Sequence, residues 1–144
     1  MSTESRRLAG VLLILLPTVA YGGTSILTLL INDPQYAENA LRRDLWRAGH
    51  AHAGLMLVLA LVTLRYVDEA NLPRRLKALA RHSIPAAAIL LPSAFFLSVL
   101  SPEATQPNAL INLAYLGAVA LTAGLVTLGI GLIRSGPTAN RRGS

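Results

Sequence analysis

The sequence predicts an all-α integral membrane protein, a four-helix bundle with up-down-up-down topology. Only 14% of the 144 residues are charged and 53% are hydrophobic, whereas soluble domains carry roughly 25% charged residues. The apolar residues also gather in four runs that are long enough to cross a hydrocarbon core of roughly 30 Å. Because this chain length allows about one domain, residues 1–144 are expected to form a single transmembrane domain.

The four predicted membrane spans cover residues 8–31, 49–67, 84–100 and 109–133. The first span could also be read as a secretory signal peptide, because Arg6 and Arg7 precede it and Thr18-Val19-Ala20 resembles a cleavage site. The apolar run continues for eleven residues beyond that point, which favours a membrane span. In the second span, Arg65 is close enough to the end for its side chain to reach the membrane surface.

The basic residues predict how the spans are oriented. With a cytoplasmic N-terminus, ten basic residues face the cytoplasm and three face outward, as the positive-inside rule requires. We therefore expect both termini in the cytoplasm and the chain in the cell membrane, the inner or plasma membrane of a bacterium. The basic residues that give the pI of about 10.8 are then expected to interact with the anionic headgroups of the lipid bilayer, and no nucleic-acid partner is expected. The ten are Arg6, Arg7, Arg65, Arg74, Arg75, Lys77, Arg81, Arg134, Arg141 and Arg142, and the three are Arg42, Arg43 and Arg47.

A short amphipathic helix is predicted in the outer connection between the first two spans. Asp33 can cap its start, a proline follows in the first helical position, and apolar residues recur at helical spacing from Tyr36 to residue 48. This helix is expected to lie along the membrane surface, with Tyr36 and Trp46 in the aromatic belt. On the cytoplasmic side, residues 73–81 are predicted to form a brief basic helix whose charges are solvated or face lipid headgroups.

Several classes of chemistry are excluded by residues that the chain lacks. Without cysteine it can form no disulfide, thiolate zinc site, iron–sulfur cluster or covalent c-type heme link. It has no Gly-x-Ser-x-Gly elbow, His-Glu-x-x-His helix or phosphate-binding glycine loop. His50 or His52 could act as a base with Glu103 as its orienting carboxylate, but only their shared side of the membrane relates them. We therefore do not predict an enzyme.

The most informative segment is residues 46–56, where His50 and His52 stand at the outer entrance of the second span. Ionisable groups near a bilayer are functional candidates, and imidazole both binds metals and titrates near neutral pH. Heme ligation, metal binding, proton handling and a plain interfacial role all remain open. On a regular helix the two side chains point about 200° apart, so both cannot bind one ion without an irregular backbone, which Gly49 would permit.

Residues 47–54, Arg-Ala-Gly-His-Ala-His-Ala-Gly, resemble the second helix of heme–copper oxidase subunit I and of short proteins related to it. The resemblance implies that His52 is an axial ligand of heme b, or that His50 is the ligand if Arg47-x-x-His50 is the matching frame. The chain lacks the later histidine-rich helices of that family, so no dinuclear heme–copper centre is expected. It also resembles small uncharacterised four-helix bacterial membrane proteins in its general form.

Polar residues recur along one face of the first and the last span. Tyr21 and Ser25 belong to the first stripe, and Asn108, Asn112 and Tyr115 belong to the second. Polar side chains disfavour contact with lipid, which leaves two interpretations open. They form hydrogen bonds between helices, or they line a polar cavity open to the outside, with Glu103 near its mouth.

Glycines of the last span favour close helix contact or a homo-oligomer interface; these are Gly117, Gly124, Gly129 and Gly131.

These observations support three hypotheses about function. The first is a small membrane protein that binds heme or a transition metal ion through His50 and His52, with Arg47 beside them, for electron transfer, sensing or delivery. The second is an oligomeric channel or transporter with a polar pathway, in which the histidines make the mouth sensitive to pH. The third is an accessory subunit of a larger membrane complex.

Overall fold

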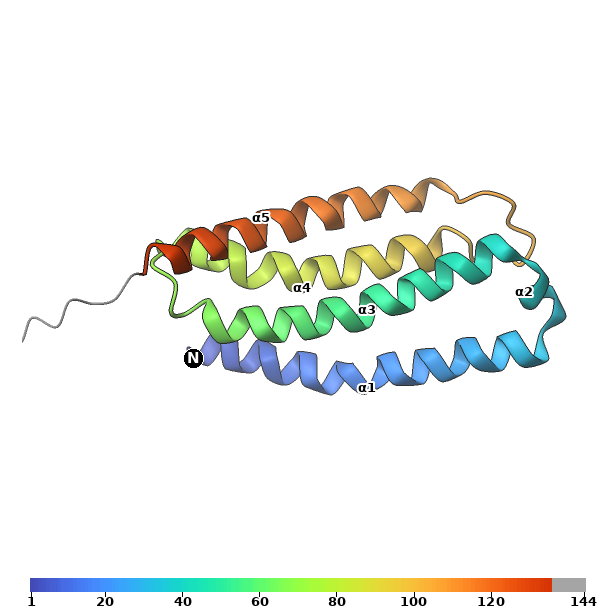
Figure 1. The fold of residues 1–144 in the computed structure, drawn as a ribbon, viewed down its shortest axis with the longest axis horizontal. Helices are drawn as coiled ribbons and strands as arrows, with labels where there is room; N and C mark the ends of the chain where they lie inside the picture. The colour runs from blue at the N-terminus through green and yellow to red at the C-terminus, as the bar shows by residue number, and fades with distance from the viewer. Residues whose placement is uncertain (136–144) are drawn as a thin grey trace, which may run out of the picture.

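The computed structural model describes residues 1–135, and these residues form helices and connecting loops without strands. Arg141 and Arg142, two of the basic residues used to predict the orientation, lie outside the described residues. The elements are α1 (Thr3–Asn32), α2 (Pro34–Glu38), α3 (Ala40–Tyr66), α4 (Arg74–Leu97), the 3-10 helix η1 (Ala109–Asn112) and α5 (Leu113–Ile133). Figure 1 labels the five α-helices. Four helices are long and apolar enough to cross a membrane, which is the make-up of a multi-pass membrane protein. The predicted all-α class is confirmed.

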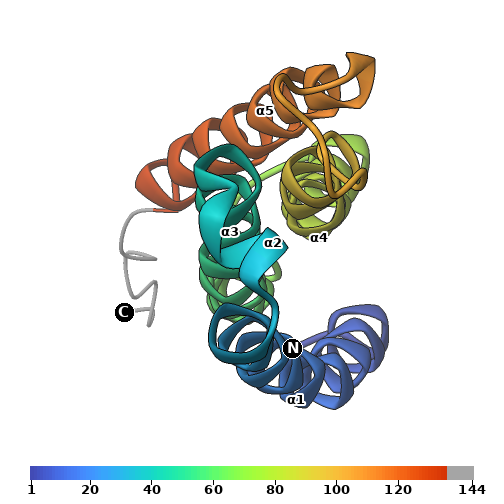
Figure 2. The same ribbon diagram turned by 90° about the vertical axis from the view of Figure 1, so that its right-hand side faces the viewer.

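The long helices form an open array, not a closed bundle. Consecutive long helices run in opposite directions (Figure 1). Within the described residues α1 packs mainly on α3, α3 packs on α4, and α4 packs on α5. Figure 2 shows α1 and α5 at opposite edges of the array. We call the end that holds the N-terminus the N-terminal end and the opposite end the α2 end.

The main apolar core lies between α1, α3 and α4. Ala60, Leu64, Ile84 and Ala87 are fully shielded, and Met56 is 5% exposed. In contrast, the most apolar window of α1 is only 6% buried, so most of α1 faces outward. The prediction of a four-helix bundle is therefore wrong for α1, because α1 packs mainly on α3, which covers only one of its faces.

Three glycines at seven-residue spacing seat α5 against the rest of the chain. A Cβ atom on Gly117 would lie 2.8 Å from Cγ of Leu91, and one on Gly131 would overlap Leu72. A Cβ on Gly124 would meet the side chains of Ser83 and Ile84. These glycines serve contact within the chain, whereas Gly129 has open space around it. Close approach of the two backbones is the usual role of small residues between membrane helices.

The outer connection differs from the predicted amphipathic helix. Its start is confirmed, because the side chain of Asp33 accepts a hydrogen bond from the backbone N–H of Tyr36 at 3.2 Å. The helix ends after one turn at Asn39, whose side chain accepts from the N–H of Arg42 at 3.0 Å and thereby caps α3. Residues 40–48 therefore extend the membrane helix. The apolar periodicity continues across Asn39 and could not reveal this second start.

Residues 73–81 also differ from the prediction. They do not form a separate basic helix, because α4 runs without a break from Arg74 through the apolar run to Leu97. Arg74 and Arg75 are exposed, as expected for solvated charges. Arg81 is 8% exposed and makes ion pairs within the chain. The helix therefore begins ten residues before the apolar run.

Candidate functional site

His50 and His52 contact different helices, as their spacing on a regular helix predicts. The ring of His50 lies against α1, where two successive glycines leave a notch. A Cβ on Gly23 would lie 2.9 Å from Cε1 and Nε2 of His50, and one on Gly22 would lie 4.0 Å from Nδ1. The imidazole therefore occupies the space that a side chain on Gly23 would take, whereas a Cβ on Gly22 would only touch the ring.

His52 is half-buried and lies on the α4 side of α3. Its ring centroid is 5.0 Å from that of Phe95, with the two planes tilted by 46°. Its Nδ1 is 2.8 Å from the backbone carbonyl oxygen of Ala48. In the tautomer in which Nδ1–H donates to this oxygen, Nε2 carries the free electron pair. Metal-binding histidines are commonly oriented by such a bond at the other ring nitrogen.

The described residues hold no group of three or more His, Asp or Glu side chains that could bind a metal ion. Because His50 and His52 face different helices, they do not form a joint site within one chain. Arg47 is exposed on α3 and joins neither ring. His82 lies at the opposite end of the array, with Nε2 3.8 Å from Oε1 of Glu4, so it cannot complete a site with the other two histidines.

An aromatic cluster at the α2 end was not predicted from the sequence. Tyr36 is fully shielded, and its ring centroid lies 5.6 Å from that of Trp46, which lies 5.9 Å from that of Phe96. The indole N–H of Trp46 donates to the carbonyl oxygen of Phe96 at 3.3 Å, and the guanidinium carbon of Arg42 lies 4.3 Å from the Trp46 ring. Tyr36 is therefore part of a packed core, not of a membrane-surface belt as expected. Burial raises the pKa of its hydroxyl.

An ion-pair network at the N-terminal end was also missed. Arg81 pairs with Asp68, with Nη2 2.8 Å from Oδ1, and with Glu4, and its Nε donates to Oγ of Ser5 at 3.0 Å. Burial opposes ionisation of Asp68, but hydrogen bonds outweigh it and lower its pKa from 3.8 to about 2. These bonds come from the backbone N–H of Ser2 and from the side chains of Ser5, Ser2 and Arg81. The network joins the start of α1 to α4 and to the α3–α4 connection.

Within residues 1–135, the side chains predicted to line a polar cavity do not come together. Tyr21 is 75% exposed and lines a shallow outward-facing groove of α1 together with Ser25. Tyr115 is 71% exposed on α5, at the other edge of the array, and Glu103 is exposed in the loop before η1. The two stripes therefore do not face each other, because periodicity identifies one face of a helix but not the direction of that face.

Among the described residues, no hydrogen bond connects the polar stripe of α1 with that of η1 and α5. Oγ of Ser25 donates to the carbonyl oxygen of Tyr21 on the same helix, at 2.9 Å. Nδ2 of Asn108 donates to the carbonyl oxygen of Leu97 at 3.1 Å, and Nδ2 of Asn112 donates to that of Ala109 at 3.0 Å. The Ser25 bond lies inside α1, whereas the two asparagine bonds lie at the end of α4 and within η1. Backbone groups at helix ends lack partners within the helix, and side chains commonly supply them.

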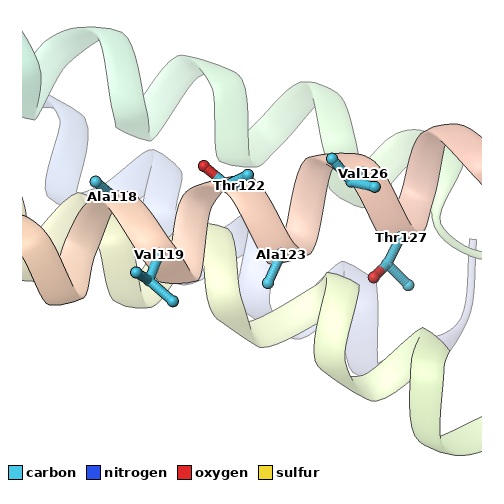
Figure 3. Close-up of a pocket in the computed structure, with 6 residues that line it drawn as sticks. All are labelled: Ala118, Val119, Thr122, Ala123, Val126 and Thr127. Atoms are coloured by element: carbon cyan, nitrogen blue, oxygen red, sulfur yellow. The ribbon is translucent and has the colours of Figure 1, made fainter.

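A groove of about 510 Å³ lies on the outward face of α5, distant in sequence from the histidines. Its lining side chains project from one helix, and Thr122 and Thr127 are the polar ones among them (Figure 3). The six lining residues are Ala118, Val119, Thr122, Ala123, Val126 and Thr127. No titratable group lines this groove, so it offers a surface for apolar packing and not a site for chemistry.

Compared with protein-family models, curated proteins and solved structures, the chain matches none. The functional argument therefore rests on the residues and on their geometry. Of the features described, His52 is the one that combines a position within a helix of membrane length, a ring nitrogen within hydrogen-bond distance of a backbone carbonyl oxygen, and a ring contact with Phe95.

Proposed function

We propose that the chain is a cell-membrane protein with cytoplasmic termini that binds heme b through His52, for electron transfer, sensing or delivery. The observation that carries the proposal is the hydrogen bond between Nδ1 of His52 and the carbonyl oxygen of Ala48. This bond supports the orientation of the ring, and it leaves Nε2 as the nitrogen that can donate an electron pair to iron. The contact with Phe95 restricts the ring further.

Heme suits this donor set better than a bare metal ion does. A structural zinc ion takes four protein ligands and a catalytic one takes three, but the described residues gather no three ligands of the His, Asp or Glu type. Heme brings four nitrogen ligands of its own and takes one or two axial ligands from the protein. One imidazole per chain is therefore sufficient for a five-coordinate heme, and two copies of the chain could supply a pair.

Changing His52 to alanine is expected to abolish heme binding, because it removes the only proposed iron ligand. Protein expressed with ample heme and purified in detergent would be measured by ultraviolet–visible spectroscopy, oxidised and then reduced with dithionite. The wild type should show a Soret band of near-stoichiometric intensity that is lost in His52→Ala. His50→Ala is the matched control, because His50 faces the glycine notch of α1, and it should retain the band. A Soret band that persists in His52→Ala, or a wild type without one, would contradict the proposal.

A second candidate function, an oligomeric channel or transporter, is favoured by the outward face of α1. Tyr21 lies near the middle of the predicted span 8–31, and its side chain is 75% exposed. No hydrogen bond of its hydroxyl group is formed within the described residues, whereas Thr24, Ser25 and Thr28 donate to carbonyl oxygens of their own helix. Because a phenol facing the bilayer centre lacks polar partners, contact with a second copy would provide them.

This second candidate predicts that copies of the chain contact each other through α1. Because the chain has no cysteine, Ser25→Cys introduces a single thiol on the polar face. Oxidation of membranes that contain this variant should give a covalent dimer in most of the protein. Leu27→Cys is the control, because Leu27 is also exposed but points about 200° away from Ser25. Equal cross-linking of both variants, or of neither, would argue against this interface.

A further inference from the structure

A second groove lies at the N-terminal end of the array, at the opposite end from α2. It has a volume of about 490 Å³ and is lined by the first three turns of α1 and by His82 of α4. Its lining residues are Thr3, Glu4, Arg7, Leu8, Val11 and His82. The proposed heme ligand His52 does not line it, and neither does any other residue of α3, so this groove is a separate feature.

The groove is polar at one end and apolar at the other, and the change occurs at the same level on both helices. Arg7 directly precedes Leu8, where the first apolar run begins, and His82 lies two residues before Ile84, where the third run begins. Leu8 and Val11 continue the groove along the apolar part of α1. A molecule that fills it must therefore present a polar group beside Arg7 and an apolar chain beside Val11.

The charges of the groove favour an anion. Arg7 forms no ion pair within the described residues, and the imidazole of His82 is exposed, with Nε2 3.8 Å from Oε1 of Glu4. The one carboxylate of the groove, that of Glu4, already pairs with the buried guanidinium of Arg81. The groove thus retains a free guanidinium, which binds phosphate oxygens in a bidentate manner, and has no unpaired carboxylate to attract a quaternary ammonium group.

We propose that this groove binds one anionic phospholipid, with its phosphate between Arg7 and His82 and an acyl chain along Leu8 and Val11. Basic pockets between membrane helices on the cytoplasmic side are known to bind anionic lipid headgroups. The proposal differs from a general attraction of the basic surface to the bilayer. In a general attraction Arg74 and Arg75, which are exposed on α4 outside the groove, would contribute as much as Arg7.

Native mass spectrometry of the full chain in a non-ionic detergent would test the proposal. The probes are phosphatidylglycerol and phosphatidylcholine with identical acyl chains, and the variants are Arg7→Gln, His82→Gln and the control Arg75→Gln. We expect one molecule of phosphatidylglycerol per chain, bound more tightly than phosphatidylcholine. Arg7→Gln should weaken it about fivefold, which corresponds to about 1 kcal/mol for one basic residue near the membrane surface. Arg75→Gln should bind like the wild type.

Two outcomes would overturn this assignment. Equal weakening by Arg7→Gln and Arg75→Gln would show attraction to the basic surface as a whole. Equal binding of both lipids would show that the phosphate site does not select an anion. Because Arg7 and His82 are exposed, Arg7→Gln and His82→Gln should keep the helical circular dichroism spectrum of the wild type. A loss of lipid binding in these variants then results from the change in the groove and not from unfolding.

Discussion

Replacing Arg81 with methionine is expected to lower the free energy of unfolding by about 4 kcal/mol, the usual cost of removing one partner from a buried ion pair. The side chain is 8% exposed and pairs with Asp68 and Glu4. With a pKa of about 2, Asp68 is ionised at neutral pH. Methionine would retain the apolar stem of the arginine. It would leave the Asp68 carboxylate without its cation and Oγ of Ser5 without its hydrogen-bond donor.

Thermal or denaturant unfolding in mild detergent at pH 7, followed by circular dichroism, would measure this effect. Arg74→Met is the matched control, because Arg74 is an exposed residue of the same helix, and it should change stability by less than about 0.5 kcal/mol. Adding Asp68→Asn to Arg81→Met should recover part of the loss, since it removes the unpaired charge. If the two arginine variants were equally stable, the network would contribute nothing to folding.

Replacing Gly124 with valine is expected to separate α5 from α4 and to lower the free energy of unfolding by about 3 kcal/mol, the upper part of the range for overpacking. A Cβ atom at this position would lie 2.9 Å from Cγ1 of Ile84 and would overlap Oγ of Ser83. Both side chains are buried. The helices would have to move apart, which would also weaken the contacts at Gly117.

Gly129→Val provides the control for this prediction. It adds the same side chain to the same helix, so the change in helix propensity is matched, but a Cβ atom there meets nothing within 4 Å. Its stability should stay within about 1 kcal/mol of the wild type. If Gly129→Val were the more destabilising of the two variants, the outward face of α5 would be the critical contact, and the seating of α5 on α4 would not be.

The sequence predicted the helical class and the four membrane-length helices because hydropathy reports directly on burial in lipid. It did not predict where α3 and α4 begin, at Ala40 and Arg74. The run from Arg74 to Arg81 is helical although it is polar, since helical backbone bonds form in water as well as in lipid. In the same way, Asn39 divides α2 from α3 by means of one capping bond, and the surrounding apolar periodicity continues across it without a change.

The candidate site was predictable only in part. The spacing of His50 and His52 correctly gave opposite directions, because that angle follows from helix geometry alone. Their neighbours Gly23 and Phe95 lie 27 and 43 positions away in the sequence, and no local pattern connects them. The partners of Arg81 were missed for the same reason, because Glu4 and Ser5 lie more than 70 positions earlier in the sequence.

The hydroxyl groups of α1 have a consequence for how the protein is made. Thr18, Thr24, Ser25 and Thr28 each donate to a carbonyl oxygen three or four residues earlier in their own helix. During synthesis α1 leaves the ribosome before α3, its main neighbour, exists. Because these four hydroxyl groups find their partners within α1, none of them needs α3 when the first span enters the bilayer. Docking of α3, with the His50 ring entering the glycine notch, then becomes a later step of assembly, and insertion of the first span does not depend on it.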